Sequence, residues 1–102
     1  MSARLAIGTL AMVVLPTVVA SETHTVSVDG MRFEPETLTV RRGDTVVWHN
    51  KDIVPHTVTA AGRFDSGQIT AGASWSWTAG QAGRSEYVCT YHPGMKAAVV
   101  VQ

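Results

Sequence analysis

Apolar and polar residues alternate along most of the chain after residue 20, and no stretch keeps the helical period of about 3.6 residues. Alternation of this kind places successive side chains on opposite faces of a β-strand. The alternating segments are short, and residues typical of turns, such as Gly, Pro, Asn and Asp, separate them. The predicted strands are residues 25–28, 38–40, 45–49, 56–59, 74–77, 87–89 and 97–101.

Two of these segments indicate which side of the strand faces a core. Val46 and Trp48 share one face of the strand at 45–49, and Trp75 and Trp77 share one face of the strand at 74–77. Many short strands at regular spacing are typical of an all-β fold. We therefore predict an antiparallel β-sandwich or barrel of about seven to eight strands with Greek-key connections.

The first twenty residues follow a different pattern. Arg4 precedes the apolar run Leu5–Leu15, and small residues lead up to Ala20. The run is short for a membrane span, which takes about 20 apolar residues, whereas this order of residues is typical of a secretory signal peptide. We expect residues 1–20 to be a signal peptide cleaved after about Ala20, and residues 21–102 to be one exported domain. An uncleaved N-terminal anchor is the alternative.

Charge narrows the range of partners. The chain has 102 residues, with 8 Lys and Arg against 8 Asp and Glu, so its formal net charge is zero. The basic residues are scattered, and no basic stripe suited to phosphate groups is visible. We therefore expect no nucleic-acid partner and no stable membrane association.

Cys89 is the single cysteine of the chain, so no intrachain disulfide can form. A bare thiol is a liability in an oxidising compartment, and a small domain without disulfides needs another source of stability. A bound metal would occupy the sulfur and would also join segments that are distant in sequence. Cys89 is therefore a candidate metal ligand, although a lone buried cysteine is often only a core residue.

Further donors lie close to Cys89 in the sequence. His92 and Met95 follow it at intervals of three residues around Pro93-Gly94, so one loop could direct a thiolate, an imidazole and a thioether at one ion. A second imidazole is needed to complete a trigonal plane, and His56 is the upstream candidate. Two His, one Cys and a weak Met form the ligand set of copper electron-transfer sites, whereas zinc prefers a stronger fourth ligand. The candidate ligands of one copper ion are thus His56, Cys89, His92 and Met95.

The motifs around these donors resemble, in order, those of the cupredoxins, the type 1 blue copper proteins. They are Met31–Pro35, Val40–Trp48, Pro55–Val58, Phe64–Gly67 and Cys89–Met95. The Cys-x-x-His-x-x-Met spacing is similar to that of the amicyanins within this family. The resemblance covers nearly all of the predicted domain. It implies a cupredoxin-like Greek-key β-sandwich with copper near one end, the upstream His on one strand and the other ligands between the last two strands.

The resemblance also implies a function. A protein of this kind is a monomeric one-electron carrier and not an enzyme, and it works in the periplasm between redox partners such as a dehydrogenase or oxidase and a c-type cytochrome. The electron would pass through His92, and Asn50 would brace the two ligand segments by hydrogen bonds. An apolar docking patch would surround His92, formed by Met31, Val54, Pro55 and Pro93.

The chain departs from the family pattern at Ser85, where an aromatic residue is usual, and at Gly94, where a bulky residue is common. Trp75 could refill the core volume that Ser85 leaves, and Gly94 would flatten the rim around the copper. Three other functions remain open from the residues alone. They are a periplasmic copper-trafficking or resistance protein, an enzyme with Cys89 as its nucleophile, and a metal-free interaction module.

Overall fold

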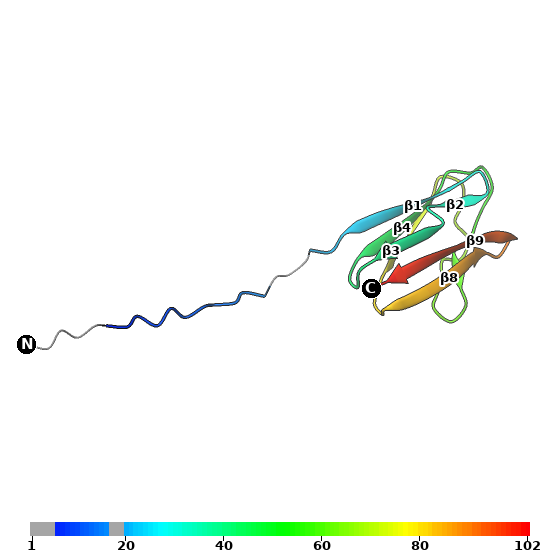
Figure 1. Ribbon diagram of the computed structural model, residues 1–102. Coiled ribbons are helices and arrows are strands. Elements are labelled where there is room, and N and C mark those ends of the chain that lie inside the picture. Colours follow the sequence, from blue (N-terminus) through cyan, green and yellow to red (C-terminus); the bar gives the residue numbers. More distant parts are fainter. Residues whose placement is uncertain (1–5, 17–19) are drawn as a thin grey trace, which may run out of the picture.

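The computed structural model describes residues 6–16 and 20–102, and its strands form a sandwich of two β-sheets (Figure 1). The described residues contain no helix. The strands are β1 (Thr23–Asp29), β2 (Arg32–Glu34), β3 (Thr37–Val40), β4 (Thr45–Asn50), β5 (Thr59–Ala60), β6 (Phe64–Asp65), β7 (Ser74–Thr78), β8 (Gly83–Cys89) and β9 (His92–Val101).

One sheet has the strand order β2-β1-β4-β7 and the other has the order β3-β9-β8-β5-β6. The predicted all-β sandwich is therefore confirmed, but the expectation of purely antiparallel pairing is wrong for two pairs. β1 pairs with β4, and β3 with β9, in parallel. After β2 the chain crosses to the second sheet as β3 and returns as β4 beside β1, and such a crossover brings the two strands into the same direction.

The strand predictions locate all the longer strands of the described residues, although β8 begins at Gly83 and not at residue 87 as predicted. β2 and β6 were missed because two or three residues show no periodicity. The strand expected at 56–59 is largely absent, since His56 forms only an isolated bridge with Ile69 and β5 covers Thr59–Ala60. β9 also begins earlier than predicted, at His92, so only two residues separate it from β8.

Trp48 lies at the centre of the core between the sheets, with no exposed surface. Its ring lies 5.4 Å from that of Trp75, 5.5 Å from that of Tyr87 and 5.9 Å from that of Phe64, measured between centroids. Burial raises the pKa of the Tyr87 hydroxyl to about 12, because the charged form would lose its hydration. Trp75 and Trp77 are partly buried against this cluster, which confirms the expected inward face of their strand.

Residues 6–16 run away from the sandwich without regular secondary structure (Figure 1). Apolar side chains in this segment are almost fully exposed, with Leu10 at 95% and Ile7 at 88%. In the described part of the chain, no helix is long and apolar enough to cross a membrane. The predicted signal peptide also includes residues 1–5 and 17–19, which lie outside the described residues, so it stays a prediction.

Asp44 ties the start of β1 to the turn before β4. Its Oδ1 accepts the N–H of Glu22 at 3.0 Å, and its Oδ2 accepts the N–H of Arg41 at 2.9 Å and lies 3.0 Å from His24 Nε2. These hydrogen bonds favour the ionised carboxylate, those from the backbone of Glu22 and Arg41 most strongly, and lower the pKa of Asp44 from 3.8 to about 2.

This lowered pKa predicts a specific acid sensitivity. Between about pH 4 and pH 2 the unfolded chain binds a proton at Asp44 that the folded protein does not, so the free energy of unfolding falls as the pH is lowered through this window. We expect Asp44→Asn to be less stable at neutral pH and to show a shallower loss below pH 4, measured by urea unfolding. Asp29→Asn, at an exposed position of β1, is the matched control and should keep the slope of the original protein. An unchanged slope in Asp44→Asn would refute this assignment.

Candidate metal centre

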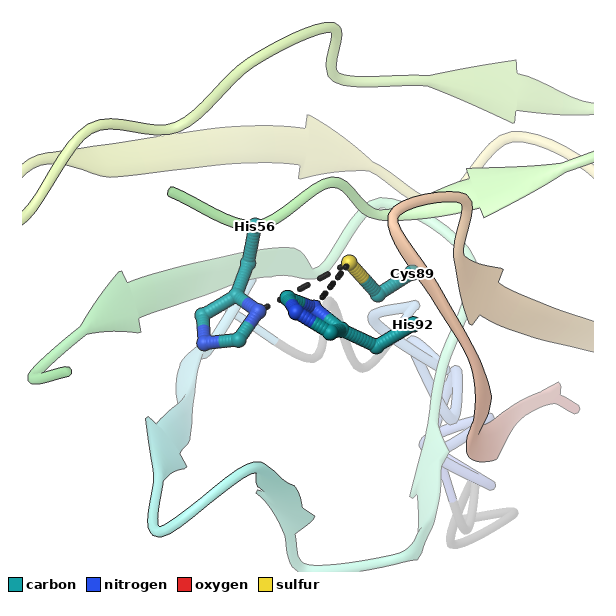
Figure 2. A group of neighbouring side chains, drawn as sticks. All are labelled: His56, Cys89 and His92. Carbon is teal, nitrogen blue, oxygen red and sulfur yellow. Dashed lines mark hydrogen bonds between the residues drawn. The ribbon is translucent and has the colours of Figure 1, made fainter. Parts of the chain in front are cut away.

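Three predicted ligands meet where β8 ends and β9 begins (Figure 2). Cys89 Sγ lies 3.6 Å from His56 Nδ1 and 3.6 Å from His92 Nδ1. The donor atoms of the three residues all lie within 4.8 Å of one another, and in the described part of the chain no other group of three His, Cys, Asp or Glu residues comes this close. His56 and Cys89 are buried and His92 is half-buried.

A tight hairpin places two of these side chains together. Cys89 is the last residue of β8, Thr90 and Tyr91 form the turn, and His92, which begins β9, pairs with Cys89. Residues opposite each other across a hairpin project from the same face, so the thiol and the imidazole point the same way.

His56 comes from the connection between β4 and β5. Its N–H donates to the carbonyl of Ile69 at 3.1 Å, and its carbonyl accepts the N–H of Ile69 at 2.7 Å. This bridge holds the backbone of His56 against the β6–β7 connection and directs the ring toward Cys89 (Figure 2). The sequence prediction that His56 joins Cys89 and His92 in space is thus matched by the structure.

Met95 lies buried on β9, three residues after His92, and belongs to the core cluster. A groove of about 390 Å³ passes beside it, lined in part by Met31 and Gly94. A side chain at Gly94 would meet no atom within 4 Å, so this residue leaves the rim open, as expected from the sequence. The role of Met95 as a fourth ligand stays a prediction.

The three converging donors fit a copper ion. Metal bonds to nitrogen and sulfur of about 2.0–2.3 Å put two donors of a trigonal site about 3.8 Å apart. The observed separations of 3.6 Å from the sulfur to each Nδ1 are close to this value. The thiolate suits Cu(I) and the imidazoles suit both oxidation states, so the donor set also matches copper chemically.

Thr57 joins the two ligand segments, a role that was not predicted. Its N–H donates to Cys89 Sγ at 3.3 Å, and its Oγ1 accepts the N–H of Thr90 at 2.9 Å. The hydroxyls of Thr57 and Thr90 also lie within hydrogen-bond distance, at 3.1 Å. Both threonines directly follow a ligand in the sequence, and this adjacency was the one available signal.

Asn50 braces a different pair of segments from the one expected. Its Nδ2 donates to the carbonyls of Val54 at 2.9 Å and Ile69 at 3.0 Å, and its Oδ1 accepts the N–H of Asp52 at 3.0 Å. These bonds shape the loop that leads to His56 and attach it to the β6–β7 connection. The link to the Cys89 segment that we expected from Asn50 is made by Thr57 instead.

Asp52 is a second residue that the sequence analysis missed. Its Oδ2 lies 2.8 Å from His56 Nε2, on the side of the ring opposite Nδ1. Partial burial acts to raise the pKa of Asp52, but hydrogen bonds from Met31 N–H, His56 and Gly30 N–H outweigh it and leave the pKa below 3.8. The carboxylate beside His56 is therefore ionised at neutral pH.

Exposed apolar side chains occur in the segments that carry or contact the site. Met31, Val54, Pro55 and Pro93, the predicted docking patch, are all exposed. Ile53, at 95% exposure, and Tyr91 are further exposed apolar residues that were not predicted. A single exposed apolar residue is ordinary on a protein surface, whereas a contiguous group of them marks an interaction site.

Comparison with known proteins identifies the family. Residues 19–102 match the model of the copper binding proteins of the plastocyanin/azurin family. The chain is 34% identical to amicyanin from Paracoccus denitrificans over 94 residues, covering 82% of this chain and 69% of that protein. It is 28% identical to amicyanin from Paracoccus versutus over 90 residues, covering 82% and 68%.

Solved structures agree with this result. A Cu(I) form of an amicyanin variant superimposes with a TM-score of 0.76 at 32% identity, covering 82% of this chain and 86% of the other. An oxidised amicyanin variant gives the same TM-score and coverage, also at 32% identity. The expected resemblance is therefore confirmed, and copper is the metal that the His-Cys-His group is built to hold. The chain belongs to the plastocyanin/azurin family of copper-binding proteins, the cupredoxins, and is amicyanin-like within it.

Proposed function

We propose that this protein carries single electrons between exported redox proteins, with one copper ion held by His56, Cys89, His92 and, as a weak fourth ligand, Met95. The observation that carries the proposal is the convergence of three donor atoms within 4.8 Å in a largely buried site. Bound copper would supply a one-electron couple between Cu(I) and Cu(II). The residues would supply a fixed set of donors acceptable to both states.

Hydrogen bonds around the site support a carrier because they restrict movement of the donors. Thr57 holds the sulfur of Cys89, and Asn50 holds the loop before His56. Donors that stay in place need little rearrangement when the charge of the site changes, and this favours fast electron exchange. Outer contacts of this kind also tune the metal.

His92 is the proposed route to a partner. His56 and Cys89 are buried, whereas His92 is half-buried and reaches the surface. A partner that docks on the exposed apolar residues Met31, Ile53 and Val54 would approach this imidazole. The interface would be small and transient, below about 1,200 Å², as is typical of redox encounters.

The proposed setting is the periplasm, with a dehydrogenase as electron donor and a c-type cytochrome as acceptor, and with the protein acting as a monomer. Removal of residues 1–20 would release residues 21–102. The exposed apolar side chains of residues 6–16, which run away from the sandwich, support a segment that is not part of the domain. Balanced charge supports partners other than nucleic acid.

Adding Cu(II) to the purified protein tests the proposal. We expect an intense visible absorption band, a bound stoichiometry of one copper, and a reversible one-electron wave in voltammetry with slow exchange of the ion. Rapid transfer of copper to an acceptor would support the trafficking function instead. A folded protein that stays colourless and whose melting temperature does not respond to Cu(II) would refute copper binding.

A further inference from the structure

The carboxylate of Asp52 lies between the His56 imidazole and the β1–β2 turn. Its Oδ2 is 2.8 Å from His56 Nε2 and also accepts the N–H of Met31 at 3.0 Å. Its Oδ1 accepts the N–H of Gly30 at 2.8 Å. The side chain of Asp52 is only 14% exposed, and that of His56 has no exposed surface. One carboxylate thus joins a proposed ligand to a hairpin more than twenty residues away.

The contact with His56 determines which ring nitrogen carries the proton. An ionised carboxylate only accepts hydrogen bonds, so Nε2 must be the N–H donor. In the neutral imidazole, which is the form that binds a metal, the lone pair is then on Nδ1, which faces Cys89 Sγ at 3.6 Å. A histidine whose second nitrogen donates to a carboxylate is the arrangement that orients metal ligands and increases their basicity.

The contact with the turn stabilises an unusual backbone. Gly30 and Met31 both have φ of 62°, and they connect Asp29 to its partner Arg32 as a two-residue hairpin turn. Turns of this type require positive φ at both positions. Glycine adopts this conformation readily, whereas for methionine it costs on the order of 1 kcal/mol. By binding both N–H groups, Asp52 offsets part of this cost.

We propose that Asp52 is a positioning residue of the copper site. It holds His56 as the Nε2–H tautomer and attaches the ring to the β1–β2 turn, so that Nδ1 stays directed at the space shared with Cys89 and His92. The inference rests on the proposed ligand set. It adds a residue outside that set whose charge favours Cu(II) over Cu(I) through the basicity of His56.

The first measurement uses the metal-free protein. Nitrogen NMR of labelled histidine should show His56 as a single Nε2–H tautomer in the original protein and as a mixture of tautomers in Asp52→Ala. In the copper-loaded proteins, Asp52→Ala should lower copper affinity about 10–100-fold, shift the visible band and raise the reduction potential. Asp52→Asn keeps one acceptor oxygen and should be intermediate. A single Nε2–H tautomer in Asp52→Ala, with affinity within about twofold of the original, would overturn the proposal.

A second variant distinguishes the effect of Asp52 on the His56 ring from its effect on the stability of the β1–β2 turn. Adding Met31→Gly to Asp52→Ala relieves the backbone cost of the turn without replacing the carboxylate. We expect the free energy of unfolding to recover while the tautomer mixture and weak copper binding persist. Recovery of full copper affinity in the double variant would show that Asp52 acts only on the turn, and would also overturn the proposal. The tautomer is measured in the metal-free protein, so this test does not depend on copper binding. If the original protein failed to bind copper, the proposed function would be wrong, but the tautomer would still show whether Asp52 positions His56.

Discussion

Cys89→Ser is expected to remove the intense visible absorption of the Cu(II) form and to lower copper affinity by more than about 100-fold. The serine hydroxyl has nearly the same size as the thiol but stays protonated near neutral pH, and its oxygen is a poor ligand for Cu(I). The Cys89 sulfur lies 3.6 Å from each of two imidazole nitrogens, and Cys89 is the single cysteine of the chain, so no other thiol can take its place. Visible spectra during a Cu(II) titration, with a competing chelator for the affinity, measure both effects.

Tyr91→Phe is the matched control for this experiment. Tyr91 lies in the same turn, and its hydroxyl donates to Gln68 Oε1 at 3.2 Å without belonging to the donor group. This variant should keep the visible band and bind copper as the original protein does. If Cys89→Ser remained blue, the ligand assignment would be refuted, whereas loss of the band in both variants would indicate damage to the turn rather than removal of a ligand.

The burial of Cys89 argues against the alternative function, an enzyme with Cys89 as its nucleophile. Cys89 has no exposed surface and accepts the N–H of Thr57, so a substrate cannot reach it in this conformation. A nucleophilic thiol instead needs access and a base free to take its proton. Together with membership of the cupredoxin family, this burial supports an electron carrier and not an enzyme.

The sequence predicted the features of this fold that repeat locally. Alternation located β4 and β7 and the inward faces of Trp48 and Trp75, because burial on one side of a strand leaves a period of two. It could not find β2 or β6, which are too short to show a period. It also missed the parallel pairing of β1 with β4, since the direction of a pair depends on where the intervening chain crosses.

The residues of the site likewise divide into those that the sequence could predict and those that it could not. Cys89 and His92 were found from their spacing, because a single hairpin holds both. Thr57 was not found, because its contacts with Cys89 and Thr90 span 32 and 33 residues and leave no local pattern. Asp52 lies only four residues before His56, but both belong to a connection without regular secondary structure, where spacing does not predict which side chains meet. Asn50 was noticed through the family resemblance, but its partners could be identified only from the fold.

Trp48→Ala is expected to lower the free energy of unfolding of the metal-free protein by about 3–5 kcal/mol, the usual cost of truncating a large buried aromatic side chain. Trp48 has no exposed surface, and its ring contacts those of Trp75 and Tyr87 from the centre of the core. Its removal leaves a cavity that the two sheets cannot close without moving their paired strands. A domain of this size has a total stability of about 5–15 kcal/mol, so the loss is a large fraction.

Denaturant unfolding measures this effect, and Ile53→Ala is the control. Ile53 is 95% exposed, so its truncation should change stability by no more than about 0.5 kcal/mol. If Trp48→Ala does not fold, Trp48→Phe should fold with a smaller loss, because the phenyl ring keeps part of the contact with Trp75. A loss below about 1 kcal/mol in Trp48→Ala would mean that the core does not depend on this ring. The strands that end at Cys89 and begin at His92 would then owe their placement to other contacts, such as that of Tyr87 with Phe33.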